Sequence, residues 1–451
     1  MLSESSGISR RNFTGAALSG ITFLAQPQRV FGANDRVRVA ICGIHGRGMD
    51  HVKSYAKVSN VEIAAVCDID ENVAAERIAE IEKMGIPKPK TYVDIRKLLD
   101  DKSIDAISIA TPNHWHALMA IWGCQAGKDV YVEKPCSHNL WEGQQLVKAA
   151  VRYNRIVQHG TQIRSATAIR EGIGKVHDGY LGEVYMARGI CFKRRNTIGK
   201  AVEEQVPKGV HYDLWTGPAP MRPFTKNRFH YNWHWNYTYG NGDLGNQGVH
   251  QLDMARWALQ MKFPNKVSAI GGHFMFDDDQ NTPNDLVCAF EFDPPGGKRR
   301  MISFEVRHWH TCTEAGIGTP EVSGKDTNPI GNIFFGSNGY MSTGDEGADT
   351  YKIWMGNHRQ PEPAVHAGNE VQHFQNFIDC VVSRKKENLN APIEEGHISC
   401  GLMHLANASY RLGRTIHFNP ETEQVIGDKE AEKLLRDGDR GYRDPYTVKD
   451  V

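Results

Sequence analysis

Residues 36–68, RVRVAICGIHGRGMDHVKSYAKVSNVEIAAVCD, constrain the fold more than any other stretch of the chain. Apolar residues alternate with others from Val37 to Ile41, and this run ends in a turn that is rich in glycine. A helix-like segment follows from about Met49, and a second apolar run, Val61–Cys67, ends on an aspartate. Strand, glycine turn, helix, strand and acid is the order of a dinucleotide-binding unit, because the turn lets backbone N–H groups and a helix N-terminus meet a pyrophosphate.

The glycine turn departs from the usual G-x-G-x-x-G spacing. Its three places hold Gly43, His45 and Gly48, with one extra glycine between the last two. A side chain at the second place crowds the approach of the backbone to phosphate, so either the turn is shifted by one residue or His45 itself faces the phosphates. A tight turn after any buried strand would give a similar pattern, but Asp68 lies where the acid that receives the ribose hydroxyls is expected. The predicted cofactor-binding residues in this unit are Gly43, His45, Gly46, Arg47, Gly48 and Asp68.

Length and composition set the broad class of the protein. A chain of 451 residues is most simply two domains with substantial cores. Lysine plus arginine and aspartate plus glutamate both number 53, so no net charge favours nucleic acid or an acidic membrane as a partner. The nine cysteines have no short repeated spacing, which gives neither a disulfide framework nor a zinc pattern, and we interpret them as small core residues.

The first 33 residues differ from the rest of the chain. Arg10 and Arg11 precede the mildly apolar run AALSGITFLA, as in a twin-arginine export signal, and that run is too short and too weakly apolar for a membrane-spanning helix. The alternative is an N-terminus without a targeting role that contains two arginines. We predict a signal peptide over residues 1–33 and therefore a periplasmic protein.

Residues 35–158 predict one Rossmann domain that binds the dinucleotide. Its further helices and strands are expected over residues 71–84, 104–110, 129–132, 140–153 and 156–158. The strands are continuously apolar, as in a parallel sheet covered on both faces. Two short motifs follow strands, TPNHWH at 111–116 and Glu-Lys-Pro at 133–135. Because ligands of open α/β sheets bind outside the carboxyl ends of the strands, both motifs are expected beside the ligand.

Residues 159–442 have a different texture and predict a second domain of the α+β class. Alternating runs over residues 183–192, 266–276, 285–292 and 299–307 indicate an open, largely antiparallel sheet. Residues 215–239 are dense in aromatic rings, which suits stacking on a sugar. Loops are expected over residues 277–284 and 313–332, and helices over 369–382 and 394–412. The helices are expected to pack back across the sheet or the domain junction, ahead of a tail at 443–451.

Several motifs together resemble the Gfo/Idh/MocA oxidoreductase family. They are the glycine turn, TPNHWH at 111–116, EKP at 133–135, WTGPAP from Trp215 and GNGDLGNQGVHQLD at 240–253. The likeness covers nearly all of the chain after the predicted signal, and the secreted, twin-arginine members of the family look nearest. The resemblance implies an N-terminal Rossmann domain, a C-terminal α+β domain with an open sheet, a bound NAD or NADP, and a pyranose or cyclitol as substrate.

The resemblance also implies roles for the residues of the Glu-Lys-Pro motif. Lys134 resembles the family's central lysine between cofactor and substrate, whose ammonium can hydrogen-bond the reacting hydroxyl and exchange its proton. A solvated surface charge is the alternative. Glu133 would orient this lysine or the nicotinamide ribose. Pro135 resembles the family proline after which the chain turns, through a cis bond in some cases.

Asn246 and His250 stand four residues apart, so on one helix they would share a face. Inositol dehydrogenase-like members of the family have aspartate at the position of Asn246. Asparagine can hold a sugar hydroxyl, but it cannot take up a proton as a carboxylate does. The general base, if not Lys134, is therefore expected to be His250, with a purely structural histidine as the alternative. Asp253 would either support the site from behind or be a charge on the helix surface.

The cofactor is predicted to be NAD rather than NADP. Asp68 would bind the adenosine ribose and repel a 2′-phosphate, and no arginine follows in the next four residues. On the nicotinamide side the predicted cofactor contacts are Thr111, Pro112, Asn113, His116, Glu133 and Lys134. The His-Trp-His triplets at His114 and His308 would each direct two histidines the same way, but they lack a third ligand at a recognisable spacing, so no metal site is predicted.

The predicted activity is hydride transfer between a hydroxyl-bearing carbon of a sugar, glycoside or cyclitol and NAD, with Lys134 and His250 managing the hydroxyl proton. The runner-up is a redox-assisted glycosidase or lyase, in which NAD oxidises a ring carbon, elimination follows and the cofactor is regenerated. A third hypothesis, which Asn246 leaves open, is a non-catalytic sugar-binding protein loaded with NAD. A homo-oligomer is expected, without a nucleic-acid or membrane partner.

Overall fold

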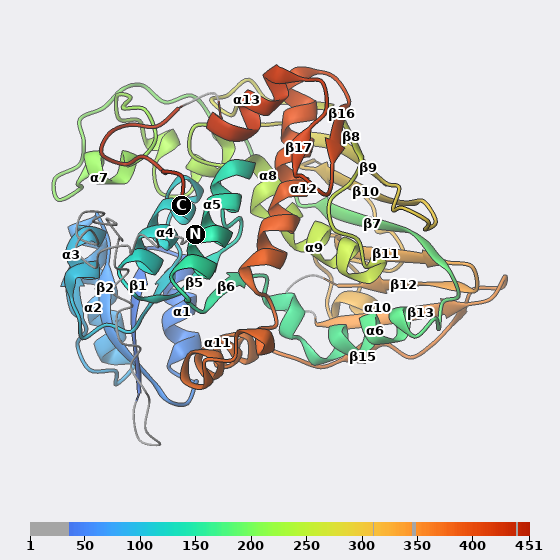
Figure 1. Ribbon diagram of the computed structural model, residues 1–451, viewed down its shortest axis with the longest axis horizontal. Helices are drawn as coiled ribbons and strands as arrows, with labels where there is room; N and C mark the ends of the chain where they lie inside the picture. Colours follow the sequence, from blue (N-terminus) through green and yellow to red (C-terminus); the bar gives the residue numbers. More distant parts are fainter. Residues whose placement is uncertain (1–35, 310, 345–348, 439–440) are drawn as a thin grey trace, which may run out of the picture.

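The computed structural model describes residues 36–309, 311–344, 349–438 and 441–451 (Figure 1). The predicted signal peptide at 1–33 lies outside these residues. None of the helices in the described ranges is both long enough and apolar enough to cross a membrane. The described chain forms two sheets, with helices packed on them and between them (Figure 1).

Within the described residues, the N-terminal part forms a six-stranded parallel sheet in the order β3-β2-β1-β4-β5-β6. This order is that of a Rossmann domain, and it confirms the predicted fold. The central strands β4 and β5 are fully buried because helices cover both faces, which explains their continuous apolar sequence. The strands are β1 (Val37–Cys42), β2 (Val61–Cys67), β3 (Lys90–Tyr92), β4 (Ala106–Ile109), β5 (Asp129–Glu133) and β6 (Val157–Gly160).

Three of the helices that connect these strands, α2, α3 and α5, begin at polar capping residues. Asp70 accepts the backbone N–H groups of Asn72 and Val73, and Asn139 accepts that of Glu142. Such caps satisfy donors that a helix N-terminus otherwise leaves free, so they fix where each helix begins. The helices are α1 (Arg47–Tyr55), α2 (Glu71–Lys83), α3 (Ile95–Asp100), α4 (Asn113–Gln125) and α5 (Leu140–Arg152).

The later part of the described chain forms an 11-stranded sheet in the order β14-β13-β12-β11-β7-β10-β9-β8-β16-β17, with β15 beside β13. Its neighbours run antiparallel except β7 and β10, which are parallel, so the sheet is largely antiparallel as predicted. The strands are β7 (Val184–Phe192), β8 (Lys266–Gly272), β9 (Asp285–Phe292), β10 (Arg300–Arg307), β11 (Ile330–Gly336), β12 (Gly339–Thr343), β13 (Thr350–Met355), β14 (Gln360–Pro361), β15 (Val365–His366), β16 (Ile416–Asn419) and β17 (Gln424–Val425).

Strands β11, β12 and β13 were missed by the sequence prediction. The loop expected over residues 313–332 is wrong at its end, because β11 begins at Ile330. Gly331 lies so close to β12 that an added Cβ would be 2.1 Å from the Thr343 carbonyl oxygen. A strand that needs glycine for this approach lacks the unbroken β-branched and aromatic pattern on which the prediction rested.

Helix α12 (Ile393–Leu412) joins the two halves of the molecule. It packs on β8 and α9 (Gly248–Leu259) on one side and on α5 and β6 on the other (Figure 1). Helix α9 covers β7 and β10, while α6 (Thr167–His177) covers β13. The other helices and 3₁₀ turns are η1 (Gln162–Ser165), α7 (Tyr212–Thr216), η2 (Lys226–Arg228), η3 (Asn232–Trp235), α8 (Gly242–Asn246), α10 (Pro320–Ser323), η4 (Lys386–Asn388) and α13 (Lys429–Asp437).

Helix α11 (Val371–Ser383) belongs to the later part of the chain but packs on the Rossmann domain, beside α1 (Figure 1). Its Phe374 stacks on Tyr131 of β5, with ring centroids 4.7 Å apart, and Phe377 lies in the same buried cluster. The helix therefore completes the core of the first domain, and the predicted division of the chain at residue 158 describes the packing only in part.

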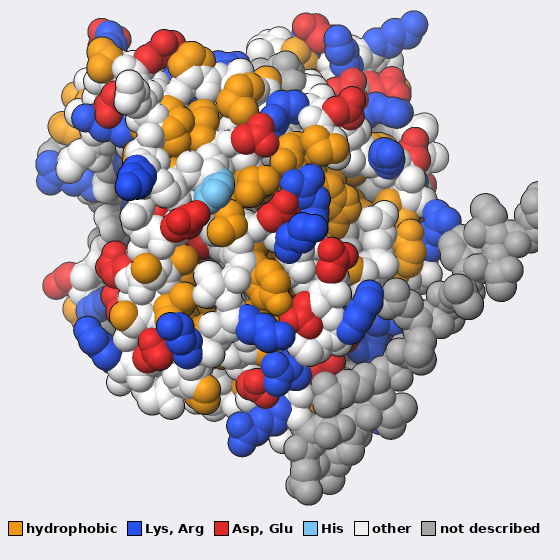
Figure 2. Space-filling model, turned by 90° about the vertical axis from the view of Figure 1, so that its left-hand side faces the viewer, with side chains coloured by type: hydrophobic (Ala, Val, Ile, Leu, Met, Phe, Trp, Pro, Cys, Tyr) orange, Lys and Arg blue, Asp and Glu red, His pale blue; other side chains and the backbone are white. Residues whose placement is uncertain are grey.

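The predicted tail at 443–451 also packs on the Rossmann domain. Tyr446 lies against Trp115 of α4, with ring centroids 5.5 Å apart, and Arg443 donates to Asp213. The chain ends beside α5, where the backbone N–H of Val451 donates to a side chain of that helix. On the face of the molecule that Figure 2 shows, acidic and basic side chains of the described residues are interspersed with apolar ones.

Candidate active site

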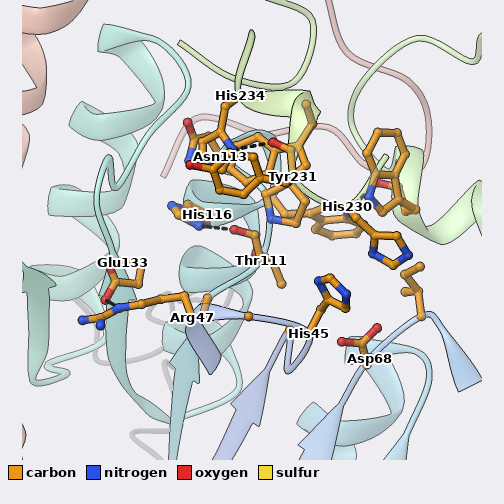
Figure 3. A pocket seen from close by; sticks show the side chains of 18 of the residues that line it. His45, Arg47, Asp68, Thr111, Asn113, His116, Glu133, His230, Tyr231 and His234 are labelled. Carbon is orange, nitrogen blue, oxygen red and sulfur yellow. Dashed lines mark hydrogen bonds and ion pairs between the residues drawn. The ribbon is translucent and has the colours of Figure 1, made fainter. Parts of the chain in front are cut away.

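A cavity of about 480 Å³ lies at the carboxyl ends of β1, β2, β4 and β5 (Figure 3). The Rossmann domain contributes the glycine turn, Asp68, residues of the 110–119 segment, and the Glu133 and Lys134 pair. The opposite wall consists of aromatic residues between positions 215 and 234, together with Asn246. This is the end of an open α/β sheet at which ligands bind, and both short motifs of the sequence reach it.

The glycine turn allows a close approach of backbone to backbone. Gly43 has a φ of +81°, which L side chains rarely adopt. An added Cβ on Gly48 would lie 1.9 Å from the Gly43 carbonyl oxygen, so Gly48 lets α1 pack directly on the turn. A Cβ on Gly46 would meet no described atom within 4 Å. His45 stacks on His230 of the opposite wall, with ring centroids 4.3 Å apart (Figure 3).

Asp68 is held at the end of β2 by two backbone donors. Its carboxylate accepts the N–H of Ile44 at 2.8 Å and that of Asp70 at 3.0 Å. Burial raises the pKa of Asp68 from its ordinary value, and the two backbone N–H groups oppose that rise. The side chain lines the cavity where the predicted adenosine ribose would lie. It is therefore oriented before any ligand arrives.

Arg47 and Glu133 lie together on the cavity wall (Figure 3). Arg47 Nε donates to Glu133 Oε1 at 3.0 Å, and the same oxygen lies 3.1 Å from His51 Nε2 and 2.8 Å from Gln162 Nε2. The guanidinium also pairs with Glu370 from the segment before α11. Burial alone would raise the pKa of Glu133, but Arg47 and His51 hold it well below its ordinary value. The carboxylate is thus ionised, and its other oxygen accepts the backbone N–H of Lys134 at 3.3 Å.

The Thr-Pro-Asn-His-Trp-His motif opens α4 and presents unpaired acceptors to the cavity. Thr111 Oγ1 and Asn113 Oδ1 are buried and have no hydrogen-bond partner in the part of the chain that the structure describes. His116 lies behind them, with its ring nitrogens 2.6 Å from the Thr111 carbonyl oxygen and 2.7 Å from the Pro135 carbonyl oxygen (Figure 3). Burial lowers the pKa of His116. This histidine therefore ties the motif to the Glu-Lys-Pro segment.

Lys134 and Asn246 meet in the cavity from the two domains. The ammonium of Lys134 donates to the Asn246 carbonyl oxygen, and the bond between Lys134 and Pro135 is cis. Asn246 Nδ2 donates to Asp243 Oδ1 at 3.1 Å, which leaves the amide oxygen of Asn246 for a ligand. The structure thus brings together the lysine and the asparagine that the sequence had singled out.

Asp243 is a buried anchor that the sequence prediction did not identify. Its carboxylate accepts two hydrogen bonds from Arg195, at 2.6 and 2.7 Å, and one from His308. Burial alone would raise the pKa of Asp243, but the charge of Arg195 and the bond to His308 hold it well below its ordinary value. The asparagine side chain at 246 is therefore oriented by an ionised, rigidly held acid.

Asn246 and His250 lie on two helices, α8 and α9, so the expectation that one helix carries both is wrong. The helix breaks at Gln247, whose φ of −118° and ψ of −42° separate α8 from α9. Asn246 lines the cavity, whereas His250 is 1% exposed and is not among the lining residues. Burial, and then the nearby charge of Lys134, lower the pKa of His250 to about 3. The catalytic role predicted for His250 stays a prediction.

Asp253 is neither a surface charge nor part of the cavity wall. It forms a two-bond ion pair with Arg164, at 2.6 and 2.9 Å, and accepts from Ser399 at 2.5 Å. Burial alone would raise the pKa of Asp253, but Arg164 brings it to about 2. Because Arg164 follows the Rossmann sheet, Asp253 lies on α9 and Ser399 lies on α12, this group joins the elements at the domain junction.

The opposite wall contains residues that the sequence prediction did not single out, although it noted the density of rings in their segment. His234 stacks on Trp233, with ring centroids 3.6 Å apart, and its Nδ1 lies 2.6 Å from the Tyr231 carbonyl oxygen (Figure 3). Burial lowers the pKa of His234 to about 3, so the ring is neutral. Trp215 and Phe229 also reach the cavity. Together these rings offer flat apolar faces with a few polar edges.

The first histidine of each His-Trp-His triplet makes a contact of another kind. His114 Nε2 lies 2.9 Å from the Trp215 carbonyl oxygen, and His308 binds Asp243. Both histidines therefore fix the ring-rich segment and Asp243 in place.

These features define a dinucleotide-binding protein with a second, ligand-facing domain. A Rossmann sheet, a glycine turn that backbone can approach, a fixed acid after β2 and buried acceptors at Thr111 and Asn113 all fit a nicotinamide dinucleotide. The residues that would hold it are those of the turn, Asp68 and the 111–113 segment.

Family models place the chain in the Gfo/Idh/MocA family. Residues 37–161 match the model described as "Oxidoreductase family, NAD-binding Rossmann fold". Residues 184–271 and 357–447 match the model described as "Oxidoreductase family, C-terminal alpha/beta domain". The protein belongs to this oxidoreductase family and has its NAD-binding domain, as the sequence motifs predicted.

Curated relatives match over about a quarter of this chain. A "Glycosyl hydrolase family 109 protein" of Shewanella pealeana is 39% identical over 122 residues, which is 26% of this chain and 27% of the relative. An "Alpha-N-acetylgalactosaminidase" of Shewanella oneidensis is 36% identical over 120 residues, 26% of either chain. The match thus spans about a quarter of these relatives.

Solved structures share the fold over most of the chain. A levoglucosan dehydrogenase in complex with NADH and levoglucosan has a TM-score of 0.63 at 17% identity, covering 87% of this chain and 100% of its own. The WlbA dehydrogenase of Bordetella pertussis, in complex with NADH and UDP-GlcNAcA, has a TM-score of 0.62 at 18% identity, covering 85% and 99%.

Proposed function

We propose that the protein transfers a hydride between a hydroxyl-bearing carbon of a sugar, glycoside or cyclitol and NAD. The observation that carries this proposal is the position of Lys134. Its ammonium lies in the cavity between the Rossmann strand ends and the ring-lined wall, held by the Asn246 carbonyl oxygen. A proton-carrying group at that place suits the oxidation of a hydroxyl.

The second wall supports a carbohydrate as the ligand. Trp233, His234 and Tyr231 offer flat ring faces, and Asn246 offers an amide oxygen that Asp243 keeps oriented. A sugar has apolar C–H faces that stack on rings and hydroxyls that need such polar partners. The solved structures with the same fold that were crystallised with levoglucosan and with a nucleotide sugar agree with this class of ligand.

Each residue of the site has a definite task in this proposal. When bound, NAD supplies the hydride acceptor. Lys134 hydrogen-bonds the reacting hydroxyl and exchanges its proton, while Glu133, which accepts the backbone N–H of Lys134, holds this strand end in place. Asn246 holds the sugar through its amide oxygen. Asp68 favours NAD, since its negative charge repels the 2′-phosphate of NADP.

The proposal is tested by Lys134→Met with Lys148→Met as the control, because Lys148 is an exposed lysine of α5. The nucleotide that heat releases from the purified protein is identified first. Sugars, glycosides and inositols are then screened for their ability to reduce this nucleotide on the enzyme. Lys134→Met should lower kcat by roughly 10²- to 10⁴-fold without loss of NADH binding. Full turnover in Lys134→Met would remove the lysine from the mechanism.

A second candidate function is redox-assisted glycoside cleavage, which the names of the curated relatives favour. In that reaction NAD is regenerated in each cycle, so a glycoside is split without net NADH. The two candidates separate when a nitrophenyl α-N-acetylgalactosaminide and a set of free sugars are assayed in parallel. Release of nitrophenol that requires NAD and leaves no NADH favours glycoside cleavage. Accumulation of NADH with a free sugar favours the dehydrogenase. Binding of sugar and NAD without either product would favour the non-catalytic hypothesis.

Export and oligomerisation are also part of the proposal. Residues 1–33 would direct the folded, NAD-loaded protein to the periplasm, and a double Arg10→Lys, Arg11→Lys variant should then remain in the cytoplasm. The exposed apolar side chains Ile270, on β8, and Val287, on β9, are paired neighbours in the large sheet and suit contact with a second copy. Light scattering after size-exclusion chromatography would give the number of chains.

A further inference from the structure

Three buried side chains that the proposed reaction does not use form a cluster behind the active site. Cys136 follows the Glu-Lys-Pro motif, His159 lies on β6 and Cys400 lies on α12. The two Sγ atoms are 3.7 Å apart, and Cys400 Sγ is 3.7 Å from His159 Nε2. All three potential ligand atoms lie within 4.8 Å of one another. Three elements of the fold therefore direct soft donor atoms to one point.

The surroundings of His159 are shaped to hold its ring there. An added Cβ on Gly396, one helical turn before Cys400 on α12, would lie 2.5 Å from the imidazole Cγ, so the ring fits only because this position is glycine. His159 Nδ1 is 3.4 Å from the Thr161 hydroxyl oxygen. With the Nδ1–H donated to that hydroxyl, the lone pair of Nε2 faces Cys400. A second hydrogen bond that fixes the tautomer is typical of histidine ligands of metals.

The distances fit a tetrahedral ion. With bond lengths of about 2.3 Å to sulfur and about 2.05 Å to nitrogen, tetrahedral angles place two sulfur ligands about 3.75 Å apart and sulfur and nitrogen about 3.6 Å apart. The observed separations are 3.7 Å and 3.7 Å. A disulfide would require the two sulfurs to approach to about 2.05 Å. Two of the three ligand pairs therefore already stand at the spacing of metal ligands, and the third, between Cys136 and His159, lies within 4.8 Å.

Charge balance favours a divalent ion. Two thiolates and a neutral imidazole carry two negative charges, which a divalent cation cancels, so the buried site would have no net charge. Soft thiolate ligands select zinc and copper(I) among common ions, and copper(I) would leave one negative charge uncompensated. On binding, the two thiols each release one proton and no electrons are exchanged.

We propose that Cys136, His159 and Cys400 bind a thiophilic divalent cation, zinc foremost, as a structural site. The ion would join the end of β5, the end of β6 and α12. Since Cys136 is two residues beyond Lys134, it would fix the strand end that carries the lysine to the helix that spans both domains. The site is separate from the cavity, because none of its three residues lines it.

The test is metal analysis of the full-length protein, purified without chelators from zinc-supplemented cells. The wild type and a Cys288→Ser control should contain about one zinc per chain, since Cys288 is a buried thiol of β9 outside the cluster. Cys136→Ser and Cys400→Ser should each contain at least tenfold less. Zinc retained in both variants, or a wild type without zinc that also fails to take up added zinc, would overturn the proposal.

A second measurement covers variants that fail to fold. Apo wild-type protein is titrated with cobalt(II), and the thiolate-to-cobalt charge-transfer band should appear at one equivalent and disappear when zinc is added. Thiols are counted in denaturant, without reductant, after removal of metal. The proposal requires nine reactive thiols in the wild type. Seven in the wild type and eight in Cys136→Ser would mean that Cys136 is joined in a disulfide, with Cys400 as its neighbour at 3.7 Å, and would refute it. Bound copper in place of zinc would refute the choice of a divalent ion.

Discussion

The substitution Gly48→Ala should destabilise the protein, although alanine is the better helix former. Gly48 lies inside α1, where alanine by itself would add about 0.5–1 kcal/mol of stability. Its Cβ, however, would lie 1.9 Å from the Gly43 carbonyl oxygen, when contacts below 3.0 Å are essentially never seen. Gly43 cannot yield easily, because its φ is +81° and its N–H is bonded to the Cys67 carbonyl oxygen at 2.8 Å.

The magnitude follows from these two terms. An overlap that forces the backbone to move costs about 3 kcal/mol, at the upper end of the range for overpacking. After the gain in helix propensity is subtracted, the free energy of unfolding should fall by about 2 kcal/mol. The matched control is Gly174→Ala in α6, whose added Cβ meets no described atom within 4 Å and which should be stabilising by about 0.5–1 kcal/mol. The sign of the effect therefore differs between two identical substitutions in helices.

Urea unfolding of the nucleotide-free variants measures both free energies, and fluorescence titration gives the dissociation constant for NADH. Gly48→Ala should lose affinity for NADH because the turn must move, whereas Gly174→Ala should bind as the wild type does. A Gly48→Ala protein that is as stable as Gly174→Ala and binds NADH normally would refute the assignment of this turn to close backbone packing.

Three further outcomes are expected. Thr111→Val removes a hydroxyl without a partner among the described residues, so stability without ligand should be unchanged or up to about 1 kcal/mol higher, while the dissociation constant for NADH rises about 5- to 10-fold in a fluorescence titration. Asp68→Ala should lower the ratio of the NADPH to the NADH dissociation constant at least about tenfold, and an unchanged ratio would contradict the role of this acid. Asp253 has a folded-state pKa of about 2, below the value of about 3.9 for an unfolded chain. Its ionisation therefore contributes about 2–3 kcal/mol to the free energy of unfolding above pH 4, and this contribution is lost as pH falls from about 4 to about 2. Asp253→Asn should flatten acid unfolding in that window. At neutral pH it should cost about 3–5 kcal/mol, because buried Arg164 loses its two-bond partner and keeps the single bond to Glu395, at 3.1 Å. Urea unfolding measures both effects.

Much of the Rossmann domain was predictable because its signals are local. In this domain β2 has the predicted limits, and α5 differs from the prediction by one residue at one end. The same holds in the later part of the chain for β9 and α12, respectively. The pattern of apolar residues in a fully buried strand or an amphipathic helix reflects which of its faces are buried. This pattern alone is therefore enough to predict the element. The position of the cavity followed from the rule for strand ends, and the family motifs supplied Lys134 and Asn246.

What the sequence did not reveal depends on contacts between distant residues. The break at Gln247 places Asn246 and His250 on different helices, and no periodic pattern marks a single residue with an unusual φ. The cluster of Cys136 and Cys400 joins positions more than 260 residues apart, whereas zinc patterns are recognised by short spacing. In the sequence Asp243 is one polar residue of a glycine-rich segment, and its ion pair with Arg195, 48 residues away, exists only in the folded structure.

Helix α11 has a consequence for the way the molecule is made. The last strand of the Rossmann sheet ends at Gly160, yet Phe374 and Phe377, which close its outer core, are synthesised roughly 200 residues later. At about 5–20 residues per second, a ribosome would hold the nascent sheet with that apolar surface uncovered for roughly 10–40 s. Newly made chains should therefore depend on a chaperone that shields this surface until α11 emerges, and an isolated fragment that ends at residue 160 should aggregate.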